Sequence, residues 1–110
     1  MDKYQEGKDS TFTHEGVDYL VDDLLKVTEK LKPESMDLNK LDWILDETTV
    51  HKDRVSKSDL SYPIIVLKSK KWGYVVLDGV HRLALAKEMG NRTIQIKLIT
   101  ENQLPSPVNK

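Results

Sequence analysis

The stretch LDGVHRLALAKEMGN, residues 77–91, constrains the fold of this chain more than any other segment. Its apolar start runs into Asp78-Gly79, a dipeptide that is also common in β-hairpin turns. Residues 83–89, however, come almost entirely from the favourable end of the helix-propensity scale, and Gly90-Asn91 then supplies a helix C-cap. The stretch therefore predicts a strand, a tight turn and a helix, with Asp78 or Gly79 near the N-cap.

Four other segments predict the elements around this junction. Residues 62–68, YPIIVLK, have the pattern of a buried strand, with a proline tolerated at its start. Residues 74–77, YVVL, predict a second strand that runs back along the first, so 62–77 predicts a hairpin. Residues 93–99 alternate apolar and polar side chains, which is typical of a strand with one exposed face. Residues 36–38 predict a short strand followed by a turn, and 48–61 a loop or a short surface helix.

The N-terminal half predicts one amphipathic helix over residues 14–31. Its regularly spaced side chains, three or four positions apart, are Val17, Leu20, Val21, Leu24, Leu25, Thr28 and Leu31. Pro33 ends the pattern. We therefore expect an α+β chain with a flexible N-terminal arm at 1–12, a single domain at 13–100 and a C-terminal tail at 101–110.

The length and composition of the chain limit the kinds of site it can form. A chain of 110 residues suits one domain, and the lack of cysteine excludes disulfides, thiolate metal sites and cysteine nucleophiles. No apolar run approaches the roughly 18 residues of a membrane span, and the N-terminus is polar, so we expect a cytoplasmic protein that does not act at a membrane.

Charge is divided unevenly along the chain. Residues 1–50 hold six lysines against thirteen acidic residues, a balance of −7, whereas residues 51–110 hold eleven basic and five acidic residues, a balance of +6. A basic half favours an anionic ligand such as a nucleotide, a phosphate or a nucleic acid. Charge alone is equally consistent with two halves that neutralise each other across one fold.

The predicted junction carries groups that can hold a phosphate. A helix N-terminus presents unpaired N–H groups and a partial positive charge, and a glycine lets a ligand approach the backbone. His81 and Arg82 add donors on the first helical turn. Asp78 could cap the helix, hold a metal beside a polyphosphate or bind a hydroxyl. In the structural alternative, Gly79 serves only the turn, His81 is a half-buried polar residue, and Arg82 pairs with an acid of the N-terminal half.

Residues 62–99 resemble the core of the ParB/sulfiredoxin-like superfamily, which includes ParB-like nuclease domains and free serine kinases. The resemblance is carried by Pro63-Ile64, the Gly-x-x-Arg turn at 79–82, Ala84 and Ala86, and the closing strand at 93–99. It extends over about residues 36–100 and implies a small mixed sheet with a hairpin and a strand-Gly-x-x-Arg-helix phosphate site. Because the DNA-reading helices that follow the ParB core are lacking, the chain is similar to small phage or mobile-element members.

The residues inside the turn separate the branches of this superfamily. Sulfiredoxins place a catalytic cysteine directly after the glycine, where this chain has Val80, so sulfinic acid reduction is excluded. ParB CTPases have Glu-Arg-Arg there, and only Gly79 and Arg82 match. Free serine kinases have Asp-Gly-His-His-Arg, and this chain matches all but the first histidine. In those kinases a glutamate after the first strand acts as general base, which points to Glu47 or, failing that, Asp46; alternatively, both carboxylates only cap a following helix.

The resemblance to the kinases implies a nucleotide-binding protein. Gly79, His81 and Arg82 would bind the phosphates of a nucleoside di- or triphosphate, accompanied by Mg²⁺. Asp78 and His81 would assist the metal or the acceptor, and Glu47 would be the base in phosphoryl transfer to a small hydroxyl compound.

Two other functions remain open at this point. One is a DNA-binding or nuclease domain that uses the basic region 52–71, against which the overall charge of −1 counts. The other is a non-catalytic protein whose acidic helix at 14–31 faces a protein partner. We expect no dedicated metal centre, because His14, Glu15 and His51 lack suitably spaced partners. Trp43 is expected in the core, whereas Trp72 could stack on a base.

Overall fold

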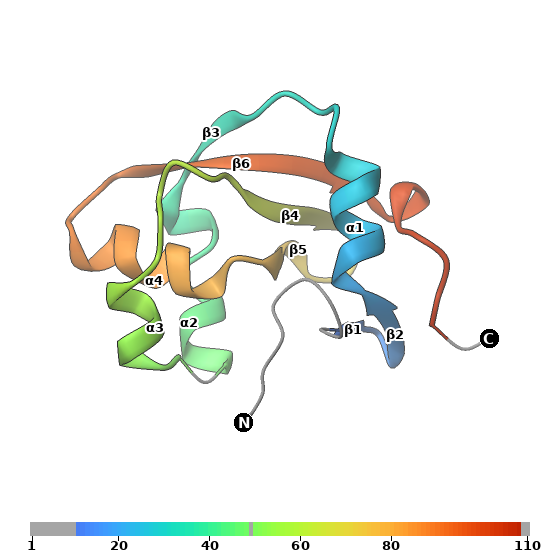
Figure 1. Cartoon of the computed structure of the whole chain (residues 1–110), viewed down its shortest axis with the longest axis horizontal. Coiled ribbons are helices and arrows are strands. Elements are labelled where there is room, and N and C mark those ends of the chain that lie inside the picture. The colour runs from blue at the N-terminus through green and yellow to red at the C-terminus, as the bar shows by residue number, and fades with distance from the viewer. Residues whose placement is uncertain (1–10, 49, 109–110) are drawn as a thin grey trace.

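The computed structural model describes residues 11–48 and 50–108 and shows an α+β fold built on one four-stranded sheet (Figure 1). The strand order is β3 (Glu34–Asp37), β6 (Thr93–Thr100), β4 (Ile64–Ser69) and β5 (Gly73–Asp78). β6 runs antiparallel to β3 and parallel to β4, and β4 and β5 form an antiparallel hairpin. The expected small mixed sheet, its hairpin and its strand-Gly-helix junction are confirmed.

Both faces of this sheet are covered, which explains why β4 is apolar without alternation. On one face, α4 (Val80–Glu88) and α2 (Ile44–Glu47) pack against Ile64, Val66 and Ile96. On the other face, α1 (Val21–Thr28) places Leu24 against a cluster whose other members are Ile65, Leu67, Leu77 and Ile99. Successive residues of a strand point to opposite faces, so one apolar strand serves two cores.

The prediction of one helix over residues 14–31 is wrong for residues 14–20. β1 (Thr11–His14) and β2 (Val17–Leu20) form an antiparallel hairpin, and α1 begins only at Val21. The two turn residues, Glu15 and Gly16, have φ values of +54° and +80°, the left-handed pair that a two-residue hairpin needs. Residues 11 and 12, expected in the arm, belong to β1, whereas residues 1–10 lie outside the described residues.

The segment between β3 and β4 contains the turn and the short helix that the sequence predicts there. After β3 come a 3-10 turn, η1 (Leu38–Lys40), then α2, and the region expected to be a loop or short helix contains α3 (Lys52–Ser56). The prediction that Trp43 lies in the core is wrong, because this side chain is 36% exposed. Leu41 and Ile44, three residues apart, take the buried positions of this segment and leave Trp43 facing outward.

The C-terminal tail begins as a short 3-10 helix, η2 (Glu101–Gln103). The backbone N–H of Val108 donates to the carbonyl of Asp18 at 2.9 Å, so the tail returns to the β1–β2 hairpin. Within residues 11–48 and 50–108, the helices are all too short or too polar to cross a membrane.

Candidate functional site

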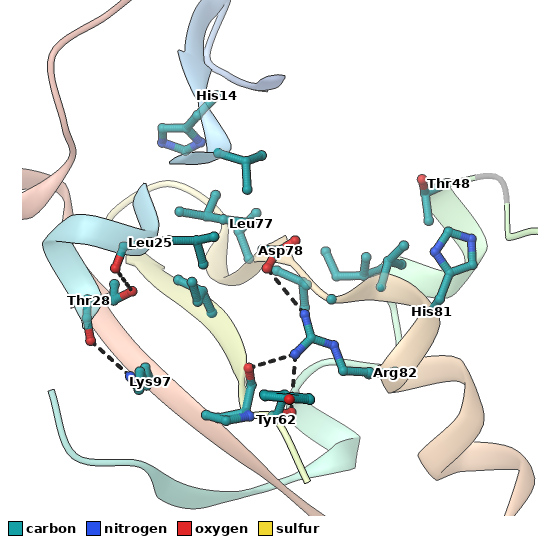
Figure 2. A pocket seen from close by; sticks show the side chains of 18 of the residues that line it. His14, Leu25, Thr28, Thr48, Tyr62, Leu77, Asp78, His81, Arg82 and Lys97 are labelled. Carbon is teal, nitrogen blue, oxygen red and sulfur yellow. Dashed lines mark hydrogen bonds and ion pairs between the residues drawn. The ribbon is translucent and has the colours of Figure 1, made fainter. Parts of the chain in front are cut away.

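A broad groove of about 1880 Å³ opens beside the junction between β5 and α4 (Figure 2). The β1–β2 turn and α1 line one side of it, α2, α3 and the start of α4 line the other, and β5 lies between them. Typical small-molecule pockets measure roughly 300–1,000 Å³. The groove therefore has room for two small substrates.

Gly79 occupies the turn that joins β5 to α4, and the structure requires a glycine there. Its φ of +112° lies in the left-handed region, and it is the N-cap residue of α4. A Cβ on this residue would stand 2.5 Å from Cγ2 of Ile64, so the space beside Gly79 is filled by the core. The glycine is thus needed for packing whether or not a ligand approaches its backbone.

Arg82 braces the same turn against the start of β4. Its Nη1 donates to the carbonyl oxygens of Tyr62 at 3.2 Å and Pro63 at 3.0 Å, and its Nη2 lies 3.2 Å from Oδ2 of Asp78 (Figure 2). The acid that Arg82 pairs with here therefore belongs to its own junction rather than to the N-terminal half. A guanidinium has five N–H donors, and these contacts use three of them.

The side chain of Asp78 is directed at Arg82, one helical turn away. Gly79 takes the N-cap position of α4, and the carboxylate of Asp78 forms an ion pair with Arg82. The two side chains are about a third and a fifth exposed. A pair that is this accessible holds the local geometry more than it stabilises the fold.

His81 lies on the first turn of α4, beside α3. Its Nε2 accepts a hydrogen bond from the backbone N–H of His51 at 3.2 Å, and the two imidazole rings are stacked with their centroids 5.8 Å apart. An acceptor nitrogen carries no proton, so in this arrangement Nδ1 is the donor of the His81 ring.

Glu47, the expected general base, is the last residue of α2 and lines the groove together with Gly79, His81 and Arg82. Residues that sequence analysis assigned to one site therefore line the same groove. Asp46 is exposed but does not line the groove, which favours Glu47 over its neighbour. The N-cap of α3 is His51 and has no side-chain cap in the described chain, so neither carboxylate is seen capping that helix.

Sequence analysis missed several groove residues, among them Asp59, Tyr62 and Lys97. A signal for Tyr62 was present: in an antiparallel hairpin the start of the first strand lies opposite the end of the second, as the pairing of Ile65 with Asp78 shows. Lys97 donates from Nζ to the carbonyl oxygens of Thr28 and Glu29, at 3.1 and 3.5 Å. Its charge therefore faces the C-terminus of α1, where a cation is favourable.

Asp59 is a groove carboxyl whose pKa is lowered by its neighbours. The hydroxyl and the backbone N–H of Ser61 donate to it at 2.6 and 2.9 Å and hold its pKa below the ordinary value, and the nearby charge of Arg82 adds a smaller effect in the same direction. The carboxylate therefore remains charged at neutral pH and contributes to the mixed charge of the groove.

The start of α4 has the donor set that phosphates require. The helical hydrogen bonds begin with Leu83 N–H to the carbonyl of Gly79, so the N–H groups of residues 80–82 fall outside the helix's own ladder. Arg82 lies beside them, and Arg54 and Lys57 add positive charge to the groove. Over the described ranges, His, Asp and Glu side chains form no group of three that could hold a metal.

One solved structure to which the chain is similar is sulfiredoxin from Arabidopsis thaliana. The two share 19% sequence identity with a TM-score of 0.48, over 64% of this chain and 90% of that one. It is a protein of the superfamily that the sequence resembles, and at this level of similarity the match says nothing about the activity of this chain. Neither a scan against protein-family models nor a search of curated proteins finds a match.

Proposed function

We propose that this protein binds a nucleoside di- or triphosphate in the groove and transfers a phosphoryl group to a small hydroxyl compound. The observation that carries the proposal is that Glu47 and the helix-opening residues Gly79, His81 and Arg82 line one groove. Phosphoryl transfer needs donors for the phosphate oxygens and a carboxylate at the acceptor hydroxyl. Both kinds of group are present, from α2 and from the start of α4, in a groove large enough for two substrates.

The phosphates would be held by the first-turn N–H groups of α4, by the two remaining donors of Arg82 and by His81. Mg²⁺ usually binds through substrate phosphates and one or two carboxylates, and Asp78 is the carboxylate at this junction. The metal would offset the charge of the phosphates. Nucleotides and Mg²⁺ are abundant in the cytoplasm, where we expect the protein to act.

Glu47 would act on the acceptor. Its carboxylate accepts the hydroxyl proton while the acceptor oxygen forms a bond to phosphorus. The bond from that phosphorus to the bridging oxygen of the nucleotide breaks, and the shortened nucleotide leaves. A positioned base of this kind accelerates a reaction by about 10²–10⁴-fold. The products are a phosphate monoester and a nucleotide with one phosphate fewer.

Calorimetric titration with MgATP, MgADP and inorganic tripolyphosphate tests the phosphate site. Arg82→Lys keeps the charge and loses the planar donor fork, and we expect it to weaken binding at least about tenfold. Arg92→Lys is the matched control, because Arg92 is exposed and does not line the groove.

A second pair of variants covers the case in which Arg82→Lys disturbs the fold. His81→Gln is expected to weaken nucleotide binding, and His51→Gln changes the stacked partner that does not line the groove. Binding of all three probes with unchanged affinity in both Arg82→Lys and His81→Gln would refute the phosphate site.

A further inference from the structure

Both tryptophans of the chain line one cleft outside the phosphate-binding junction. The cleft has a volume of about 480 Å³ and is lined by Trp43, Glu47, Lys71 and Trp72. Trp43 and Trp72 are 36% and 52% exposed, so they contribute little to either core. Exposed tryptophans gathered at one concave place are typical of a site that binds a flat, partly apolar group.

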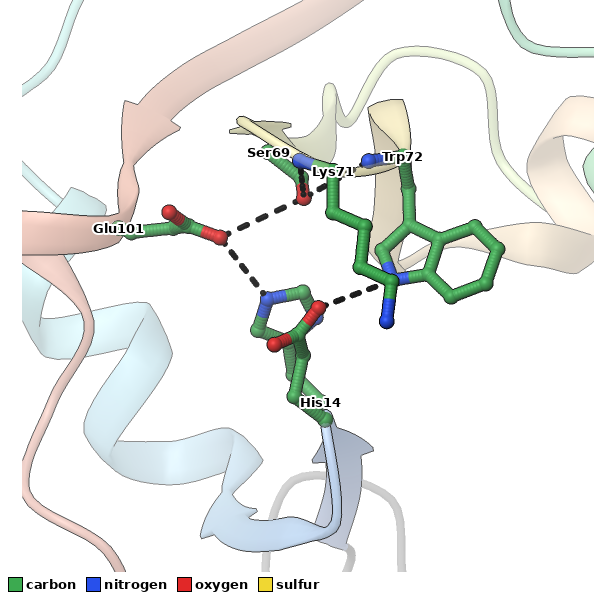
Figure 3. Close-up of polar contacts among 6 residues, drawn as sticks. His14, Ser69, Lys71, Trp72 and Glu101 are labelled. Carbon is green, nitrogen blue, oxygen red and sulfur yellow. Dashed lines mark hydrogen bonds and ion pairs between the residues drawn. The ribbon is translucent and has the colours of Figure 1, made fainter.

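The ring of Trp72 is held in a fixed position (Figure 3). Its Nε1–H donates to Oε2 of Glu15 at 3.0 Å, and the ammonium of Lys71 lies 5.3 Å from its centroid. The turn that carries it is fixed by Ser69, whose Oγ accepts the backbone N–H groups of Lys71 and Trp72 at 3.2 and 3.1 Å. A side chain that is ordered before binding loses less conformational entropy when a ligand stacks on it.

The cleft is continuous with the groove, because the four residues that line it also line the groove. Its Lys71–Trp72 side lies at the start of β5, away from the junction that follows Asp78. Its other side includes Glu47 of α2, a helix that contacts α4. Glu47 lines the cleft, so a molecule bound between the tryptophans is next to the proposed base.

We propose that this cleft is the acceptor subsite and that the acceptor is a nucleoside. This inference rests on the proposed function, and it names the substrate class that the same site takes. The heterocycle stacks against Trp43 and Trp72, as bases stack on aromatic side chains in nucleic-acid-binding proteins. Lys71 is exposed beside the Trp72 ring, and its ammonium donates to an acceptor on the edge of the heterocycle. A sugar hydroxyl then faces Glu47.

The choice of a nucleoside follows from the groups that the cleft combines. Two indole rings need a flat partner, Lys71 needs a hydrogen-bond acceptor, and Glu47 needs a hydroxyl proton. A heterocycle joined to a hydroxylated sugar supplies all three. In the reaction, the sugar oxygen forms the new bond to phosphorus, its proton goes to Glu47, and the nucleotide leaves with one phosphate fewer.

Tryptophan fluorescence tests this subsite directly, because both of the chain's tryptophans line the cleft. We expect adenosine or uridine, neither of which carries a phosphate, to quench the emission, and ribose alone to leave it unchanged. Trp72→Leu and Trp43→Leu are each expected to weaken nucleoside binding about tenfold or more, measured by calorimetry. Lys71→Ala weakens it too, whereas Lys70→Ala, an exposed lysine of the same turn outside the cleft, does not.

The outcomes separate this inference from the proposed function. No binding of either nucleoside, or wild-type affinity in both Trp→Leu variants, overturns the acceptor subsite and leaves tripolyphosphate binding at the junction untouched. Loss of tripolyphosphate and nucleotide binding refutes the proposed function instead. A saturating nucleoside should leave the affinity for a non-hydrolysable ATP analogue unchanged within about twofold. Direct competition would mean that the cleft holds the base of the nucleotide, and would overturn the acceptor assignment.

Discussion

Nη2 of Arg82 lies 3.2 Å from Oδ2 of Asp78, so the two ends of the turn around Gly79 are joined by a charged pair. The same guanidinium holds the carbonyl oxygens of Tyr62 and Pro63. Arg82 therefore connects the start of β4, the end of β5 and the first turn of α4. The arginine that we assign to the proposed phosphate site therefore also shapes the turn at which that site lies.

Arg82→Met should lower the free energy of unfolding by about 1–3 kcal/mol, because two backbone carbonyls lose a charged donor. Asp78→Asn should cost less than about 1 kcal/mol, since this ion pair is partly exposed. Urea unfolding measures both, with Arg92→Met as the control within about 0.5 kcal/mol of wild type. Equal losses for Arg82→Met and Arg92→Met would contradict the bracing role.

Gly79→Ala should destabilise the protein by roughly 2–4 kcal/mol, because it combines a left-handed backbone with a clash against Ile64. Gly73→Ala is the matched control. Gly73 has a φ of +81° and open space around its Cβ position, so only the backbone term of about 1–2 kcal/mol remains. Similar unfolding midpoints for the two variants would contradict this prediction, because they would mean that the Ile64 side chain can move aside without loss of stability.

Glu47→Gln should reduce kcat by about 10²–10⁴-fold while nucleotide affinity stays within about twofold of wild type. The amide keeps the size of the side chain and cannot take up the hydroxyl proton. Asp46→Asn alters the adjacent acid, which does not line the groove, and should leave kcat unchanged. Turnover by Glu47→Gln at the wild-type rate would remove Glu47 from the base role, and the phosphate site would be unaffected.

Asp59 should titrate below the ordinary aspartate pKa in an NMR measurement, and Ser61→Ala should raise its pKa toward that value. The folded pKa lies below the unfolded one, so ionised Asp59 favours the folded state above the unfolded pKa. This contribution is lost as the pH falls through the folded pKa. Wild type and Ser61→Ala should therefore differ in stability at neutral pH and converge in acid. The same Asp59 titration in both proteins would exclude the Ser61 hydroxyl as the cause.

The junction at residues 77–91 could be predicted because its signals are local. The apolar strand, the glycine and the run of helix formers each act over a few residues, and β5, Gly79 and α4 follow in that order. The β4–β5 hairpin was predictable for the same reason. The carbonyl partners of Arg82 were not, because a backbone acceptor leaves no trace in the sequence.

The N-terminal region shows how a periodic pattern can mislead. Val17, Leu20 and Val21 fit helical spacing, yet the first two belong to β2 and only the third starts α1. The informative residues were Glu15 and Gly16, a two-residue turn between segments of β-forming residues. The prediction for Trp43 was wrong for a different reason. The local sequence pattern does not determine which apolar side chains of a short helix are buried.

The melting temperature of the wild-type protein with nucleotide and Mg²⁺ tests the central claim most directly. A ligand at 100 times its dissociation constant stabilises the folded state by about 2.7 kcal/mol, which for a domain of this size raises Tm by roughly 10–20 °C. We predict such a rise with at least one of MgATP, MgADP or MgCTP. An unchanged Tm with all three at millimolar concentration would contradict a nucleotide site at the start of α4.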